Sequence, residues 1–208
     1  MLRLAYLVLV GLFVVGYALL AHYTNVAGTE TLGTIVALAP ILVAAVSLTW
    51  QLRRHKVIPI LFVLACLALA IAWGRIEKHY SLIYWLEHAG TELFLCFIFG
   101  RTLLEGREPM VTFFARMIHG PLSPELQAYT RAVTKAWVAF FAVMAALSTL
   151  LFLLVSVEVW SMFANFFTAP LIALMFLGEY LVRRRLHPKM EHAPILEGVK
   201  AYWKHPAP

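Results

Sequence analysis

The chain has 208 residues, of which 62% are hydrophobic, and its mean hydropathy is +0.81. A soluble domain of this size does not need so much apolar surface, so the composition excludes an ordinary soluble protein and indicates one that lies in lipid. The net charge of +6 would fit nucleic acid in a soluble protein. Because the chain carries no nucleic-acid recognition module, we expect no nucleic-acid partner.

Six long apolar stretches follow one another along the chain, and each is close to the roughly 20 residues that a helix needs to cross a bilayer. They cover about residues 4–21, 32–50, 57–73, 82–99, 136–157 and 163–182. We therefore predict an all-α, polytopic membrane protein. Residues 1–182 would form a transmembrane domain of six helices, and residues 183–208 a basic cytoplasmic tail.

The positive residues sort between alternate loops of this arrangement. Of the 17 Lys and Arg residues, 15 lie on one side of the predicted membrane, and only Arg75 and Lys78 lie on the other. Because positive residues stay on the cytoplasmic side, both termini are predicted to be cytoplasmic. Contact with the headgroups of anionic membrane lipids follows from the same charge pattern.

The stretch 82–99 differs from the others because it carries three ionisable side chains, Glu87, His88 and Glu92. His88 and Glu92 are four residues apart, so they share a face of the helix. A charged group at bilayer depth costs on the order of 3 kcal/mol, and it normally faces the bundle interior and marks an ion path, a proton relay or a polar substrate site. A buried His–Glu pair that only fixes helix packing is the alternative.

The longest segment outside these stretches, residues 100–135, is predicted to be cytoplasmic. Apolar residues between Met110 and Ile118 recur on one helical face, which indicates an amphipathic helix that lies in the membrane interface or packs on the end of the bundle. Arginine forks bind phosphate bidentately, so the segment could hold a phosphate-bearing headgroup or an acidic partner. Ordinary cytoplasmic charge with local Glu–Arg pairs is the alternative. The candidate binding residues are Arg101, Arg107, Arg116, His119 and Arg131.

Polar residues return in the last apolar stretch, at Asn165 and Thr168. This stretch and 82–99 start from the same side of the membrane, so these residues could meet the ionisable group there. A hydrogen bond that only holds two helices together is the alternative to a substrate contact. The predicted intramembrane polar site comprises Glu87, His88, Glu92 and Asn165.

The chain contains no motif for a known reaction. There is no phosphate loop, no HExxH, no GxSxG and no paired nucleophile and base. Two ligands four residues apart could begin a metal site, but no second Glu-x-x-His follows. The sequence therefore gives no support for a serine or cysteine hydrolase. Whether the chain is an enzyme stays open, with a non-enzyme favoured; no catalytic residue can be named, and neither a metal nor a cofactor is expected.

Short motifs mark the segment from residue 100 to the start of the fifth stretch. They are Gly100-Arg101-Thr102-Leu103, Gly106-Arg107-Glu108-Pro109, Phe114-Ala115-Arg116, His119-Gly120-Pro121-Leu122-Ser123-Pro124-Glu125, Tyr129-Thr130-Arg131 and Ala136-Trp137. Together they resemble a family of bacterial inner-membrane proteins encoded in gene clusters for aryl polyene or xanthomonadin-type pigments. Some members carry the label ketosynthase, but this chain lacks the soluble thiolase-like mass that such an enzyme requires.

The resemblance implies a location in the bacterial inner membrane and a role in assembling or handing over a lipid-linked polyene or other acyl product. An acyl carrier protein or pigment-synthesis enzymes would then be partners beside the membrane lipids. Two alternatives stay open. One is a small proton-coupled transporter or flippase for a lipid or small solute, and the other is a non-catalytic membrane anchor for soluble synthases.

Overall fold

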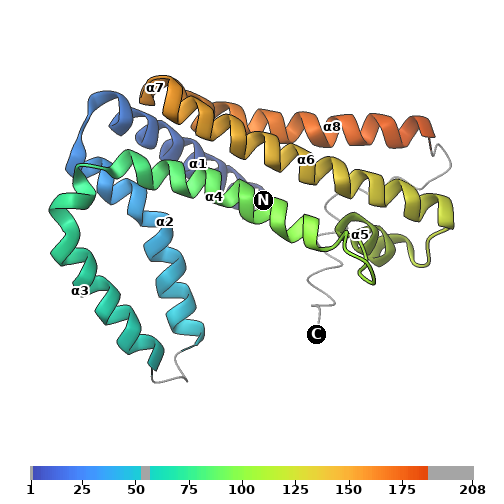
Figure 1. Cartoon of the computed structure of the whole chain (residues 1–208), viewed down its shortest axis with the longest axis horizontal. Coiled ribbons are helices and arrows are strands. Elements are labelled where there is room, and N and C mark those ends of the chain that lie inside the picture. Colours follow the sequence, from blue (N-terminus) through green and yellow to red (C-terminus); the bar gives the residue numbers. More distant parts are fainter. Residues whose placement is uncertain (1, 53–56, 187–208) are drawn as a thin grey trace. The chain divides into compact units, whose positions relative to one another are not determined.

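The computed structural model describes residues 2–52 and 57–186 of the chain. Within these ranges every regular element is a helix (Figure 1). The elements are α1 (Leu2–Ala27), α2 (Glu30–Gln51), α3 (Val57–Glu77), α4 (Tyr80–Arg101), α5 (Met110–His119), α6 (Pro124–Leu154), α7 (Val157–Met162), the π-helix η1 (Phe163–Phe167) and α8 (Thr168–Leu186). The all-α prediction is confirmed. Most of the predicted tail over residues 183–208 lies outside the described residues.

Over residues 2–52 and 57–186, six helical segments are long and apolar enough to cross a membrane, which confirms the polytopic membrane class. The sixth is continuous through α7, η1 and α8, over Val157–Leu186. Several helices extend beyond the apolar stretches from which they were predicted. The helix α1 runs to Ala27, beyond the apolar stretch that ends near residue 21, and Gly28 makes the turn with φ of 62°.

The first of two compact units comprises residues 1–88 and 148–168. Its core holds Ala21, Val36, Ala37, Tyr80, Tyr84 and Trp160. The helices α2 and α4 approach closely here, since a Cβ at Gly33 would lie 2.5 Å from the Tyr80 ring. The buried residues of α2 lie between Gly33 and Leu38, before Pro40 inside the same helix. Helix α3 has no buried residue, as expected for a helix that lipid surrounds.

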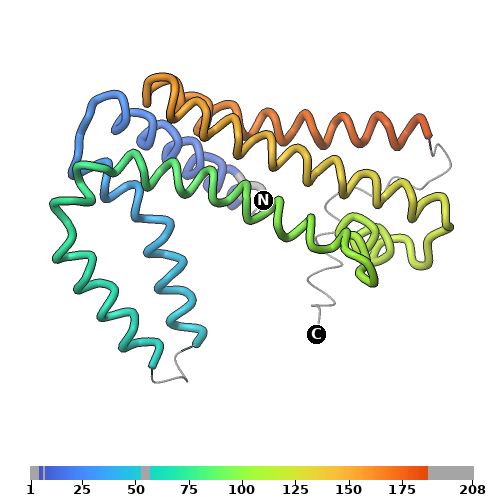
Figure 2. The backbone as a smooth tube through the Cα atoms, in the orientation of Figure 1, coloured from blue at the N-terminus to red at the C-terminus, as the bar shows by residue number. Residues whose placement is uncertain are grey.

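The second unit comprises residues 89–147 and 169–208, of which the described part ends at 186. Its core is aromatic, with Trp137 and Phe141 of α6 beside Phe99 of α4, and the Trp137 ring centroid lies 4.7 Å from that of Phe176 on α8. Figure 2 follows the backbone from α4 through the short helix α5 into α6. Helix α6 starts at Pro124, well before its apolar part, and the Ser123 hydroxyl accepts the Leu126 amide at 3.3 Å as an N-cap.

Candidate functional site

Threonines attach α5 to α6 in the second unit. The hydroxyls of Thr112 and Thr130 lie 2.7 Å apart, and the Val111 amide donates to the Thr134 hydroxyl at 3.2 Å. Thr112 is 6% exposed, although it is a polar residue of this amphipathic helix. The helix expected between Met110 and Ile118 is therefore present, and one polar residue is used to pack it on the bundle. Its position relative to a bilayer stays a prediction.

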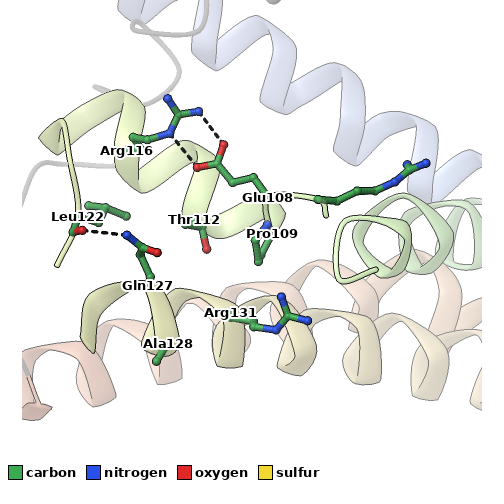
Figure 3. A pocket seen from close by; sticks show the side chains of 9 residues that line it. Glu108, Pro109, Thr112, Arg116, Leu122, Gln127, Ala128 and Arg131 are labelled. Atoms are coloured by element: carbon green, nitrogen blue, oxygen red, sulfur yellow. Dashed lines mark hydrogen bonds and ion pairs between the residues drawn. The ribbon is translucent and has the colours of Figure 1, made fainter. Parts of the chain in front are cut away.

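A pocket of about 470 Å³ opens between α5, the loop before it and the start of α6 (Figure 3). It lies entirely within the second unit. Its lining residues are Arg107, Glu108, Pro109, Thr112, Arg116, Leu122, Gln127, Ala128 and Arg131. Three arginines and one glutamate give this lining a formal charge of +2. An excess of guanidinium groups around a concave space favours an anionic ligand.

Glu108 and Arg116 form a bidentate ion pair at the edge of this pocket. Arg116 donates from Nε to Glu108 Oε1 at 2.7 Å and from Nη2 to Oε2 at 2.6 Å (Figure 3). The hydrogen bonds and then the charge of Glu108 raise the pKa of the Arg116 guanidinium above its ordinary value. The two side chains keep 52% and 34% of their surfaces exposed, so the pair is within reach of solvent.

Arg131 lines the pocket from α6. Its Nη2 donates to the Leu103 carbonyl at 2.8 Å, which ties the loop after α4 to α6. A guanidinium has five N–H donors, so this bond leaves several of them for a ligand. No ion pair involves Arg107 or Arg131 among the residues that the structure describes. These two residues therefore supply the uncompensated charge of the pocket.

The structure brings together three of the five predicted binding residues. Arg107, Arg116 and Arg131 line the pocket, whereas Arg101 ends α4 and His119 ends α5 without lining it. Gln127 also lines the pocket, and its side-chain amide donates to the Leu122 carbonyl at 3.0 Å. The sequence did not predict it as a site residue. An exposed glutamine at the start of a helix carries no signal that would have identified it.

A second polar cluster lies around His88 in the first unit. The His88 Nδ1 atom lies 3.0 Å from the Ser148 hydroxyl, and its Nε2 atom lies 2.8 Å from the Thr168 hydroxyl. The Trp160 indole N–H donates to the same Ser148 oxygen at 3.0 Å. The sequence predicted that Thr168 could contact the ionisable residues of α4, and it does contact His88. The predicted partner Glu92 is not among the hydrogen-bond partners of His88 in the described part of the chain.

Because its partners are hydroxyls, His88 can adopt more than one protonation state without losing its hydrogen bonds. A hydroxyl both donates and accepts, so Ser148 and Thr168 can satisfy either neutral tautomer of the imidazole, and the doubly protonated ring as well. No carboxylate is needed to hold the ring in place. The arrangement can therefore anchor helices α4, α6 and the last span to one another, and it can equally accept and release a proton.

Asn165 belongs to a neighbouring network instead. Its Nδ2 donates to the Ser161 carbonyl at 2.9 Å and to the Ser161 hydroxyl at 3.1 Å, and the latter lies 3.1 Å from His22 Nδ1. Asn165 sits within the π-helix η1. Single π turns inside α-helices occur frequently at functional sites. His22 and Ser161 were not predicted, because a histidine at the end of an apolar stretch is ordinary in sequence.

The two glutamates of α4 differ in burial. Glu92 is 4% exposed, and its Oε2 atom has no hydrogen-bond partner among the described residues. Glu87 is partly exposed. No group of three His, Cys, Asp or Glu side chains that could hold a metal ion occurs in residues 2–52 and 57–186.

Comparison of the chain with protein-family models, with curated proteins and with solved structures finds no match.

Proposed function

We propose that this protein is an integral membrane accessory protein that binds the phosphate-bearing headgroup of a lipid-linked acyl product in the α5–α6 pocket. Binding there would assist the assembly or membrane handover of that product. The observation that carries the proposal is the convergence of Arg107, Arg116 and Arg131 on one space. The polyene nature of the product and the bacterial inner membrane rest on the family resemblance, and cytoplasmic termini rest on the charge pattern.

Size and composition of the pocket support a headgroup as the ligand. A volume of about 470 Å³ falls in the range of roughly 300–1,000 Å³ that is usual for small-molecule sites. Guanidinium forks match the oxygens of a phosphate in charge and geometry. The lining also includes the apolar side chains of Pro109, Leu122 and Ala128, which can contact the carbon atoms that follow the phosphate in a lipid.

A binding experiment with two arginine variants tests this function. We expect Arg107→Gln with Arg131→Gln to weaken the binding of dioctanoyl phosphatidic acid to the detergent-solubilised protein by at least about tenfold, because two charge-assisted contacts are lost. Arg101→Gln is the matched control, since it removes an exposed arginine from the same segment outside the pocket. Equal affinities of the double variant and the control would refute headgroup binding at this site.

A transporter or flippase is the second candidate, and the His88 cluster favours it. A histidine whose two ring nitrogens each face a hydroxyl, beside a π turn, can bind and release a proton within a helix bundle. Proteoliposomes with a fluorescent phospholipid in both leaflets test this candidate by dithionite quenching. Faster exchange than in empty liposomes, abolished by His88→Gln at normal protein abundance, would support it. Exchange equal to that of empty liposomes would dismiss lipid transport.

A further inference from the structure

The ion pair between Glu108 and Arg116 points to the chemical class of the ligand. A carboxylate that bridges Nε and Nη2 of an arginine at 2.7 and 2.6 Å uses the geometry that a phosphate uses on the same fork. In the pocket, therefore, one arginine is already occupied by an anionic group of the protein itself. We propose that the pocket binds a phosphate monoester and that Glu108 holds the place of this phosphate on Arg116 in the ligand-free protein.

The charge of the pocket favours a monoester over a diester. Its three arginines and one glutamate leave a formal charge of +2. A phosphate monoester carries about −1.5 to −2 charges at neutral pH, whereas the single ionised oxygen of a phosphodiester carries about half of that. Once Glu108 has moved out, the three arginines carry a formal charge of +3, so the monoester offsets more of this charge than a diester does. Its three terminal oxygens, against two in a diester, can engage Arg107, Arg131 and Arg116 together.

The position of Glu108 allows it to leave. It belongs to the loop between α4 and α5, close to Gly106, which has a φ of 76°, whereas Arg116 is fixed in helix α5. The pair is exposed to solvent at both side chains, and exposed ion pairs are weak. A ligand that brings two charges to Arg116 can thus replace a carboxylate that brings one, and Glu108 swings out on its loop.

Removal of the Glu108 charge tests the replacement. Glu108→Gln keeps the side-chain size but abolishes the competing charge, so we expect it to tighten the binding of dioctanoyl phosphatidic acid by about three- to tenfold. Glu105→Gln is the matched control, because Glu105 is exposed on the same loop but does not line the pocket. We expect it to change affinity by less than about twofold, as distant exposed charges are screened.

Two ligand comparisons complete the experiment, which uses the full chain in detergent micelles. The wild-type protein should bind dioctanoyl phosphatidic acid more tightly than dioctanoyl phosphatidylglycerol, a diester with the same chains. Competition by inorganic phosphate would show that the phosphate group alone is recognised, and its failure to compete would assign the site to a lipid monoester. Both results support the proposal.

Three results would overturn it. They are equal affinities for the two lipids, an unchanged or weakened affinity in Glu108→Gln, and an equal gain in Glu105→Gln. The lipid comparison decides the matter even where Glu108→Gln does not fold. The inference rests on headgroup binding at the pocket, but it fails separately. If the Arg107 and Arg131 variants lose binding while the Glu108 variant gains nothing, the pocket stands and the place-holding role of Glu108 does not.

Discussion

Ser148 offers the sharpest test of the polar cluster around His88, because its one hydroxyl contacts two partners. It accepts the Trp160 indole N–H and contacts His88 Nδ1, both at 3.0 Å. Ser148 is 0% exposed and Trp160 is 1% exposed, so no solvent can replace the lost partner in Ser148→Ala. Interhelical hydrogen bonds in membrane proteins contribute about 0.6 kcal/mol on average and up to about 1.7 kcal/mol. Two such bonds give an expected destabilisation of about 1–2 kcal/mol.

A double-mutant cycle isolates the tryptophan bond within that total. Trp160→Phe removes the N–H donor but keeps most of the ring that packs on Phe152 at 5.2 Å between centroids. Ser148→Ala and Trp160→Phe should therefore couple by about 0.6 kcal/mol or more when unfolding is followed in mixed micelles of rising dodecyl sulfate fraction. Ser47→Ala is the control, because Ser47 is exposed on α2, and we expect it to change stability by less than about 0.5 kcal/mol.

Additive effects of the two substitutions would refute the reasoning. So would a Ser148→Ala variant as stable as Ser47→Ala, since a fully buried hydroxyl with two partners cannot be lost without consequence if the cluster is formed as described. A large coupling together with normal lipid exchange in the dithionite assay would have another meaning. The cluster would then hold the helices together and have no transport role.

Two further predictions concern the membrane. If both termini are cytoplasmic, as the charge pattern predicts, reporter fusions at Gly28 and Ser156 should give signals from the opposite side of the membrane and a fusion at Leu122 a cytoplasmic one; a non-cytoplasmic signal at Leu122 would exclude this topology. Spin labels at Phe114 and Arg116 of α5 should differ in their accessibility to lipid-soluble and water-soluble relaxers, because Phe114 projects from the apolar side and Arg116 pairs with Glu108. Identical accessibility at both sites would mean that α5 does not lie at the interface.

The architecture was predictable from the sequence because lipid imposes a simple rule on it. A helix must remain apolar for about 20 residues to cross the bilayer, and this length appears directly in the hydropathy pattern. Helix ends did not follow from the same rule. The last turns of α1 are polar enough to resemble a loop, yet they are helical because capping and tertiary contacts, which hydropathy does not measure, decide where a helix stops.

The sequence names some residues of the candidate sites but not the partners that they contact. The spacing of His88 and Glu92 correctly puts them on one helix, but the partners that hold His88, Ser148 and Thr168, lie 60 and 80 residues away in the chain. Likewise the arginines of the pocket were named as candidates because arginine binds phosphate. The pairing of Arg116 with Glu108, however, depends on how the loop before α5 turns. Such pairings are set by tertiary structure, and a local pattern cannot encode them.

The burial pattern of α5 bears on where the pocket lies. In a soluble protein the apolar residues of a surface helix are buried and the polar ones exposed. Here Thr112 is 6% exposed while Phe114 is 38% exposed. The threonine can be buried at low cost because Thr130 satisfies its hydroxyl at 2.7 Å. An exposed phenylalanine next to a buried, satisfied threonine is the pattern expected where the outer surroundings of the helix are themselves apolar. If α5 lies at the interface as predicted, the arginine pocket beside it would be open to a phosphate whose acyl chain stays in the membrane.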